Sequence, residues 1–296
     1  MGRDPKHDYK GRCIYHITIG KAPACPAFSR ISGSPAAPVV ARSPVGEIIE
    51  RQIVNLPNLC SSLQILQYII MPDHIHFAIF ARQYLPRSIG RYIGMMKVKC
   101  GQIIRETFPD ISDVFSPDFH DRYLLPGHKL DTIFSYIREN PRRLLERRAN
   151  PLFFQRVNNI EINGAHWQAF GNLQLLENPF KAPVVIHRAD SDAVRFAKHR
   201  RWKHIYENGG ILVSPFISPA EKEVRRLCEE AGGKIILLSN RSFEEKEKPA
   251  AHDFEQCSKG RLLILAPIAP LAPGRASFLY LNSIAESIAI PTQSIF

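Results

Sequence analysis

Several common signatures are missing from this 296-residue sequence. Its six cysteines include no Cys-x-x-Cys pair, which argues against a thiolate zinc site and predicts reduced thiols, not a disulfide framework. Neither GxGxxG nor GxxxxGK followed by Ser or Thr occurs, so both common phosphate-binding loops are absent. No apolar run could span a bilayer, and the charged first residues do not resemble a signal peptide. We therefore expect a cytoplasmic protein that does not enter membranes.

The charge is positive and unevenly distributed. The formal net charge is +11. Residues 1–170 contain 22 Lys and Arg against 14 Asp and Glu, whereas residues 171–296 contain 17 against 14. Solubility alone would explain a milder excess, but a basic first half indicates a polyanionic partner, and nucleic acid is the leading candidate.

The length predicts two domains, which we place at residues 1–170 and 171–296. The first half combines strand patterns with amphipathic helices, which predicts an α+β domain. Its expected strands are 12–20, 63–71, 74–80 and 115–125, and its expected helices are 45–56, 85–108 and 129–148. The Pro-rich segment 21–44 reads as a surface loop, and 153–170 is expected to pack back on the same sheet. Pro141 predicts a kink or an end in the third helix.

The second half has a different pattern of apolar and helical segments. Short, continuous apolar runs alternate with helical segments, which indicates a parallel sheet covered on both faces, a Rossmann-like α/β domain. The runs are 182–188, 211–214, 234–239 and 261–266, and the helices are 190–207, 219–231 and 276–289. The stretch Ser218 to Glu221 has the form of a capped helix start. An anion site at that helix end is the alternative, and we favour the simple cap.

The stretch "MPDHIHFAIF" (71–80) places two histidines one residue apart in an apolar strand. Side chains alternate along a strand, so His74 and His76 leave by the same face. Two imidazoles on one face suit a divalent metal, because a polar group in an apolar strand needs a partner. The alternative is a pair of inert, hydrogen-bonded histidines, and a motif this short also arises by chance.

A second constellation lies about sixty residues later, in "YIRENP". Tyr136 and Asn140 are four residues apart and share one helix face. A phenol and an amide oxygen opposite two imidazoles would form a metal site with a nucleophile beside it. The same helix carries a basic cluster, namely Arg138, Arg142, Arg143, Arg147 and Arg148. The alternatives are a core aromatic for Tyr136 and a solvated helix face for the arginines.

The segments "YHITIG", "MPDHIHFAIF", "FHDRYLL" and "YIRENP" resemble, in order and spacing, the single-tyrosine HUH transposases and especially the REP-associated tyrosine transposases. The resemblance covers roughly residues 10–170. It implies a ferredoxin/RRM-like antiparallel sheet with helices, Tyr136 as the nucleophile, and Mg²⁺ or Mn²⁺ held by His74, His76 and Asn140. The sequence departs from the family in its proline-rich segment 21–44, and in carrying Asn140 where some relatives carry Gln.

The implied reaction is nicking and strand transfer of single-stranded or hairpin DNA through a 5′-phosphotyrosine link, and a homodimer is also implied. Arg138, Arg142, Arg143 and Arg147 are candidate DNA contacts. His120 and Asp121 are candidate helpers of the nucleophile, and an ordinary strand-end pair is the alternative. Tyr92, Tyr123 and Trp167 are candidates for base stacking, with a place in the core as the more common alternative. The competing hypothesis is a non-catalytic or domesticated DNA-binding or regulatory protein on the same scaffold.

The second half resembles the Rossmann-like DNA-processing domains of the DprA/SLOG type. The resemblance rests on the layout of "GNLQLLENPFKAPVVIHR", "GGILVSPFISPAEKEVRR" and "GGKIILLSN". It carries no catalytic residues over to this chain. We expect a DNA-binding or targeting module, with nucleotide sensing as the alternative.

Overall fold

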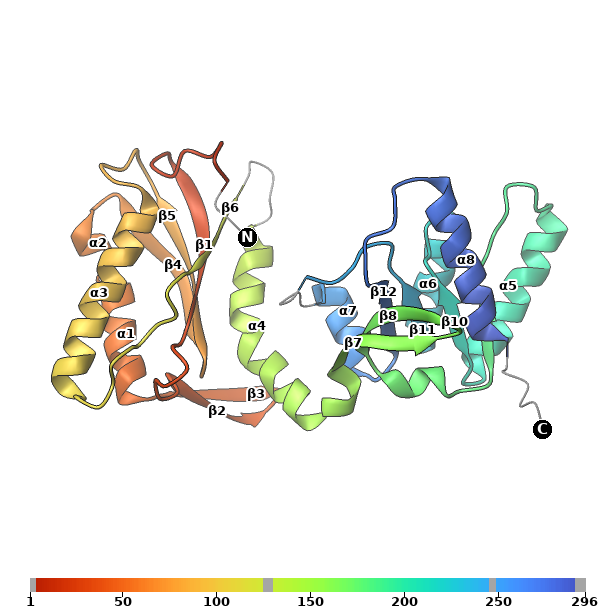
Figure 1. Cartoon of the computed structure of the whole chain (residues 1–296), viewed down its shortest axis with the longest axis horizontal. Helices are drawn as coiled ribbons and strands as arrows, with labels where there is room; N and C mark the ends of the chain where they lie inside the picture. The colour runs from red at the N-terminus through yellow and green to blue at the C-terminus, as the bar shows by residue number, and fades with distance from the viewer. Residues whose placement is uncertain (1–3, 125–129, 245–248, 291–296) are drawn as a thin grey trace. The chain divides into compact units, whose positions relative to one another are not determined.

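A computed structural model describes residues 4–124, 130–244 and 249–290 (Figure 1). The chain divides into two compact units, Met1–Glu146 and Arg147–Phe296. This moves the predicted boundary from residue 170 to Glu146, because the segment expected to pack on the first sheet forms two strands of the second unit's sheet. Leu125 and Lys129, the predicted end of a strand and start of a helix, lie outside the described residues.

The first unit is an antiparallel sheet with helices, as predicted. Its strand order is β4 (Leu63–Ile70), β5 (His74–Ala81), β1 (Cys13–Gly20) and β6 (His120–Tyr123). The helices between them are α1 (Pro44–Val54), α2 (Leu56–Leu59) and α3 (Ile89–Thr107). Leaving aside a small hairpin, the chain runs β-α-β-β-α-β with the two central strands first and third, which is the ferredoxin-like topology.

The two faces of this sheet are covered by different helices (Figure 1). Along β1, Tyr15, Ile17 and Ile19 are fully buried in a core shared with α1 and α3. The intervening His16 and Thr18 point to the opposite face, where α4 (Leu130–Ala149) lies. The period-2 alternation of β1 therefore separates an apolar core face from a polar face beneath α4.

Residues 21–44 are more ordered than the predicted loop. They contain a two-stranded hairpin, β2 (Ser29–Ser34) and β3 (Ala37–Arg42), joined by Pro35 and Ala36. Gly33 has φ +86°, and a Cβ there would collide with the Ala37 carbonyl oxygen. The proline content suggested a loop, but a short hairpin that forms its own two-stranded sheet tolerates prolines at its ends and turn.

The second unit has a six-stranded mixed sheet. Its strand order is β7 (Gln155–Ile162), β8 (Ala165–Gly171), β12 (Leu262–Pro267), β11 (Lys234–Leu238), β10 (Ile211–Ser214) and β9 (Lys181–Pro183). The last four strands are mutually parallel, as predicted, and β7 and β8 add an antiparallel hairpin. Two short 3₁₀ turns cover Pro151–Phe154 and Leu173–Leu176.

Helices cover both faces of the parallel strands. Three of them, α5 (Asp192–Glu207), α6 (Pro219–Glu230) and α7 (Ala251–Ser258), share one core, and α8 (Arg275–Ala289) shares the other. The parallel strands follow one another in sequence order, so they lack the reversal of strand order at which Rossmann enzymes bind dinucleotides. The structure thus confirms the α/β architecture of the second unit, whereas its assignment as Rossmann-like or DprA/SLOG-like stays a prediction.

Glu221 settles the two interpretations of the "SPAE" stretch. Its carboxylate accepts hydrogen bonds from the backbone N–H groups of Ile186 (3.2 Å), Ile217 (3.0 Å) and Ser218 (3.0 Å). The Ser218 hydroxyl accepts from the Glu221 N–H, which completes a capping box. The favoured interpretation, a capped helix start, is confirmed, because the protein's own carboxylate occupies the place an anion would take.

A Glu221→Ala variant is expected to lower the free energy of unfolding of the second unit by about 2–4 kcal/mol. Three N–H groups would lose their acceptor in a buried place. Both tryptophans, Trp167 and Trp202, belong to this unit, so their fluorescence in urea reports its unfolding. The exposed neighbour Lys222→Ala is the control. Equal urea midpoints for Glu221→Ala and Lys222→Ala would show that the Glu221 carboxylate does not stabilise the helix start.

The remaining sequence expectations concern thiols and membranes. All six cysteines are free, as predicted. Burial raises the pKa of the Cys100, Cys228 and Cys257 thiols to about 12, which leaves these three unreactive. No helix within the described parts of the chain is long and apolar enough to cross a membrane.

Candidate active site on the polar face of the first sheet

His74 and His76 share the polar face, as the alternation along β5 predicted. The strand register pairs His76 with Thr18 and His74 with Gly20 of β1. The two imidazole centroids are 4.6 Å apart, with their ring planes at 78°. His76 is 3 % exposed, so it lies at the base of the site beneath α4.

Both rings are held through Nδ1. His74 Nδ1 donates to the Asp73 carboxylate at 2.6 Å, and His76 Nδ1 hydrogen-bonds the Thr18 hydroxyl at 2.8 Å. A carboxylate partner at Nδ1 fixes the tautomer of His74 and leaves the lone pair on Nε2. Metal-ligating histidines usually have a second-shell partner of this kind.

Tyr136 meets these histidines from α4. Its ring centroid is 5.4 Å from that of His76, and the rings meet edge to face at 72°. The residue lies one turn before Asn140, which is 4 % exposed and donates from its amide nitrogen to the Tyr136 carbonyl at 2.7 Å. The rings of His74, His76 and Tyr136 are thus in contact through His76. Asn140, the fourth predicted site residue, lies one helix turn after Tyr136.

Pro141 does not end the helix. Helix α4 continues to Ala149, although Pro141 has no N–H to donate to the Ile137 carbonyl. Beyond the proline, Arg142 bonds Glu139 (2.6 Å) and Glu146 (2.5 Å), spacings that support a helix. Tyr136 and Asn140 both precede Pro141, so they lie on consecutive turns of one uninterrupted helical segment.

The donor set fits a divalent cation in part. Among the described residues, no three His, Cys, Asp or Glu side chains converge closely enough to hold a metal ion. The set predicted here contains two imidazoles and the Asn140 amide, with Asn outside those residue types. His74 Nε2 is buried and has no hydrogen-bond partner among the described residues, which suits a lone pair reserved for a cation. Mixed nitrogen and oxygen donors suit Mn²⁺, and Mg²⁺ less well.

A third histidine, His16, completes the face and was not singled out from the sequence. Its ring centroid is 5.1 Å from His76 and 5.7 Å from Tyr136. Burial, and secondarily the charge of Arg122, lowers the pKa of His16 to about 4. The signal that could have found it is its place in "YHITIG", where it alternates with buried Tyr15 and Ile17.

His16 predicts an acid-dependent loss of stability in the first unit. The folded state keeps His16 neutral to about pH 4, whereas the unfolded chain takes the proton near 6.5. The contribution of His16 to the free energy of unfolding is therefore fully present above pH 6.5. It falls by up to about 1.4 kcal/mol per pH unit between 6.5 and 4. Hydrogen exchange of β1 and β5 amides, without divalent metal, measures it. A His16→Asn variant that keeps the full wild-type slope would contradict the assignment.

The predicted DNA-contacting arginines fall into different environments. Arg138 is exposed and reaches the Ser135 hydroxyl at 3.3 Å. Arg142 is engaged by two carboxylates of its own helix. Arg143 is buried, with its guanidinium carbon 5.7 Å from the Tyr136 ring centroid. Arg147 belongs to the second unit and lies over the Phe254 ring. Of the four, Arg143 is in contact with the nucleophile candidate.

Two helper residues were predicted, and the sheet register separates them. His120 of β6 pairs with Thr18 of β1, so it shares the histidine face, and it is exposed. Asp121 pairs with Ile17 and therefore faces the opposite side. The prediction placed the two residues together because they are adjacent in sequence, but adjacent strand residues point to opposite faces.

The aromatic residues predicted to stack bases are engaged within the protein. Tyr92 is 4 % exposed, and Trp167 is 1 % exposed and stacked on Tyr280. Tyr123 donates to the Asp4 carboxylate at 2.7 Å and stacks on His7. A base would have to displace these contacts, so the structure does not support the stacking role.

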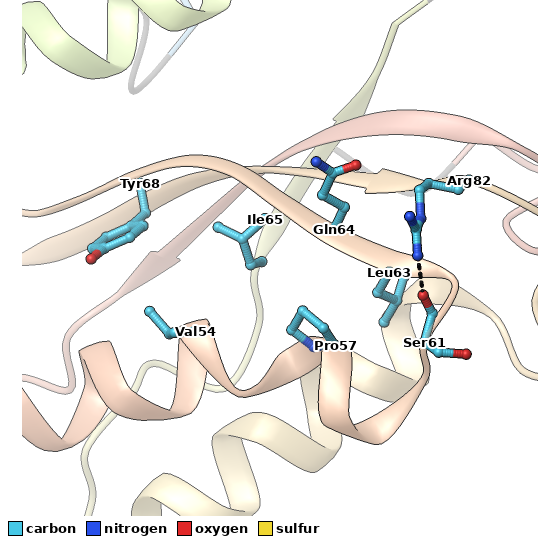
Figure 2. A pocket seen from close by; sticks show the side chains of 8 residues that line it. All are labelled: Val54, Pro57, Ser61, Leu63, Gln64, Ile65, Tyr68 and Arg82. Carbon is cyan, nitrogen blue, oxygen red and sulfur yellow. Dashed lines mark hydrogen bonds between the residues drawn. The ribbon is translucent and has the colours of Figure 1, made fainter.

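A groove of about 600 Å³ lies elsewhere in the first unit, beside the edge strand β4 and the helices α1 and α2. Figure 2 shows its lining, with Ile65 and Tyr68 of β4 across from Val54 and Pro57. The lining contains none of the predicted site residues. The groove is therefore separate from the histidine face.

Comparison with known proteins adds two distant structural likenesses. No family model matches the sequence, and no curated protein matches it. A REP-associated tyrosine transposase bound to a REP hairpin is 8 % identical, over 51 % of this chain and 74 % of its own, with a TM-score of 0.32. A protein from Deinococcus radiodurans R1 described as a transposase is 14 % identical, over 47 % of this chain and 96 % of its own, with a TM-score of 0.30. The structural neighbours are thus transposases, and at this distance the functional argument rests on the site residues themselves.

Proposed function

We propose that this chain is a metal-dependent enzyme that nicks single-stranded DNA and transfers the strand through a 5′-phosphotyrosine intermediate. The observation that carries the proposal is the placement of a phenol beside paired imidazoles. The Tyr136 ring is 5.4 Å from His76, whose ring is 4.6 Å from His74. Paired imidazoles that would hold an electrophilic cation, with a nucleophile beside them, are the arrangement that metal-assisted phosphoryl transfer requires.

The chemistry follows from these groups. The Tyr136 hydroxyl releases its proton to water, its oxygen attacks the scissile phosphorus, and the bond from phosphorus to the 3′-oxygen breaks. The 5′ end stays on the tyrosine, and the departing 3′-oxygen takes a proton from water. The link conserves the energy of the phosphodiester, so a second 3′-hydroxyl can reverse the step and join strands without ATP. Bound Mg²⁺ or Mn²⁺ would supply Lewis-acid polarisation of a non-bridging phosphate oxygen.

The chain's own residues have assigned roles in this proposal. His74, His76 and Asn140 would hold the cation, and Asp73 and Thr18 orient the two rings. The Arg143 guanidinium carbon lies 5.7 Å from the Tyr136 ring centroid and would place a positive charge beside the nucleophile. The expected partner is single-stranded or hairpin DNA, and the homodimer implied by the sequence resemblance stays a prediction.

The test uses the purified chain, Mn²⁺ and hairpin-bearing single strands labelled on either side of the nick. We expect an adduct that survives denaturing electrophoresis and carries the segment whose 5′-phosphate is linked. The other segment should be released with a 3′-hydroxyl that a ligase or polymerase can use. If varied hairpins give neither adduct nor nicking with Mn²⁺ or Mg²⁺, the chain is instead a non-catalytic DNA-binding protein.

A further inference from the structure

Helix α5 of the second unit has an unusual charge pattern. Its sixteen residues contain five Lys and Arg against one Asp and one Glu, and two histidines besides. The side of the helix that packs on the sheet is defined by Trp202 and Ile205, both 4 % exposed. Phe196, Arg200 and Lys203 follow one another at spacings of four and three on the exposed side of the helix, and the exposed Arg201 flanks them about 100° around the helix axis. We call these four residues the α5 ridge.

The arginines of the ridge differ from other helical arginines of the protein. Arg142, Arg225 and Arg226 each have two carboxylate partners, at least one of them three or four residues away on the same helix. Within four residues of Arg200 or Arg201 the sequence has no Asp or Glu. Among the described residues, no carboxylate forms an ion pair with either of them. Their charges are therefore directed to solvent without internal neutralisation.

Lys203 adds a third cation with little internal compensation. Its ammonium is 3.7 Å from the Glu207 carboxylate, and both side chains are largely exposed. An exposed pair of this kind contributes little, and a polyanion can displace it. Like charges three residues apart, as in Arg200 and Lys203, also disfavour the helix when nothing neutralises them. An anionic partner on the ridge would remove that repulsion.

Phe196 decides between classes of polyanion. It is 65 % exposed and lies one helical turn before Arg200. An exposed aromatic ring beside arginines suits an unpaired base stacked on the ring with its phosphates on the cations. A duplex offers no free base face. A membrane surface would require a continuous apolar helix face, and here that face is buried in the protein.

We propose that the α5 ridge binds single-stranded DNA, with phosphates on Arg200, Arg201 and Lys203 and a base on Phe196. The surface belongs to the second unit and uses none of the residues of the proposed nicking site. It gives the second unit a concrete role in holding a strand, and it supplies the exposed aromatic that Tyr92, Tyr123 and Trp167 do not.

The test locates the contact directly. The full chain is crosslinked in EDTA to an oligonucleotide containing 5-iododeoxyuridine, and the attached peptide is identified by mass spectrometry. We expect attachment within α5, abolished by Phe196→Leu and by duplex formation. In the same buffer, Arg200→Gln with Arg201→Gln should weaken oligo(dT) binding about tenfold and reduce the salt slope by about 1.4. Arg226→Gln, which removes an arginine neutralised on α6, is the matched control.

Two results would overturn the proposal. One is attachment confined to peptides outside α5. The other is an affinity of the double variant equal to that of Arg226→Gln. Because no divalent metal is present, both readouts are independent of nicking, so failure of the ridge and failure of the catalytic proposal are distinguishable.

Discussion

A Tyr136→Phe variant is expected to form no covalent DNA adduct and to lose nicking by about a thousandfold or more. The substitution removes one oxygen and keeps the ring, so the edge-to-face contacts with His16 and His76 can persist. Hairpin binding should therefore remain close to that of the wild type. Denaturing electrophoresis with a labelled strand measures the adduct, and a filter or anisotropy assay measures binding.

Tyr123→Phe is the matched control for that experiment. Tyr123 also belongs to the first unit, but it pairs with Tyr15 on the face opposite His74 and His76, and its hydroxyl donates to Asp4. The control should form the adduct at the wild-type rate. An adduct of undiminished yield in Tyr136→Phe would place the nucleophile on another residue.

A His74→Ala variant is expected to lose cleavage by about a hundredfold or more while still binding hairpin DNA. The residue is at the start of β5 and lies on the polar face of the sheet, outside the apolar core that β5 shares with α1 and α3. What it contributes is an Nε2 lone pair oriented by Asp73. The rate should be measured over a range of Mn²⁺ concentrations, and high Mn²⁺ should recover part of the loss.

The control for the metal-ligand variant is His166→Ala. His166 is an exposed histidine of the second unit, hydrogen-bonded to Asn159. It should leave both cleavage and its Mn²⁺ dependence unchanged. If His74→Ala abolishes hairpin binding together with cleavage, the histidines are structural and the metal site is not there.

The sequence pattern alone was sufficient to predict strands and helices in segments where the spacing of apolar residues follows one clear period. The β-branched and aromatic residues of β1 and the apolar run of β5 predicted both strands, and the two-residue period of a strand placed His74 and His76 on one face. Apolar spacing gave α3, α5 and α6 to within a few residues, and the "SPAE" stretch gave a helix start whose cap is present in full. These features depend on interactions between near neighbours in sequence, which a single sequence contains.

Other features depend on distant pairings and could not be predicted in the same way. His16 lies in the site only because β1 pairs with β5. Asp121 lies on the other face only because of the register in which β6 pairs with β1. The boundary moved because β8 pairs with β12, almost one hundred residues later. One local signal was missed: Asn163 and Gly164, both with positive φ, form the turn between β7 and β8 that an Asn-Gly pair favours.

The most direct measurement of the central claim is the position of Mn²⁺ by anomalous scattering in crystals of the protein grown with the metal. We predict one peak within about 2.3 Å of Nε2 of both His74 and His76, on the α4 side of the sheet where Tyr136 lies. A peak remote from both imidazoles, or no peak at a Mn²⁺ concentration that supports cleavage, would contradict it.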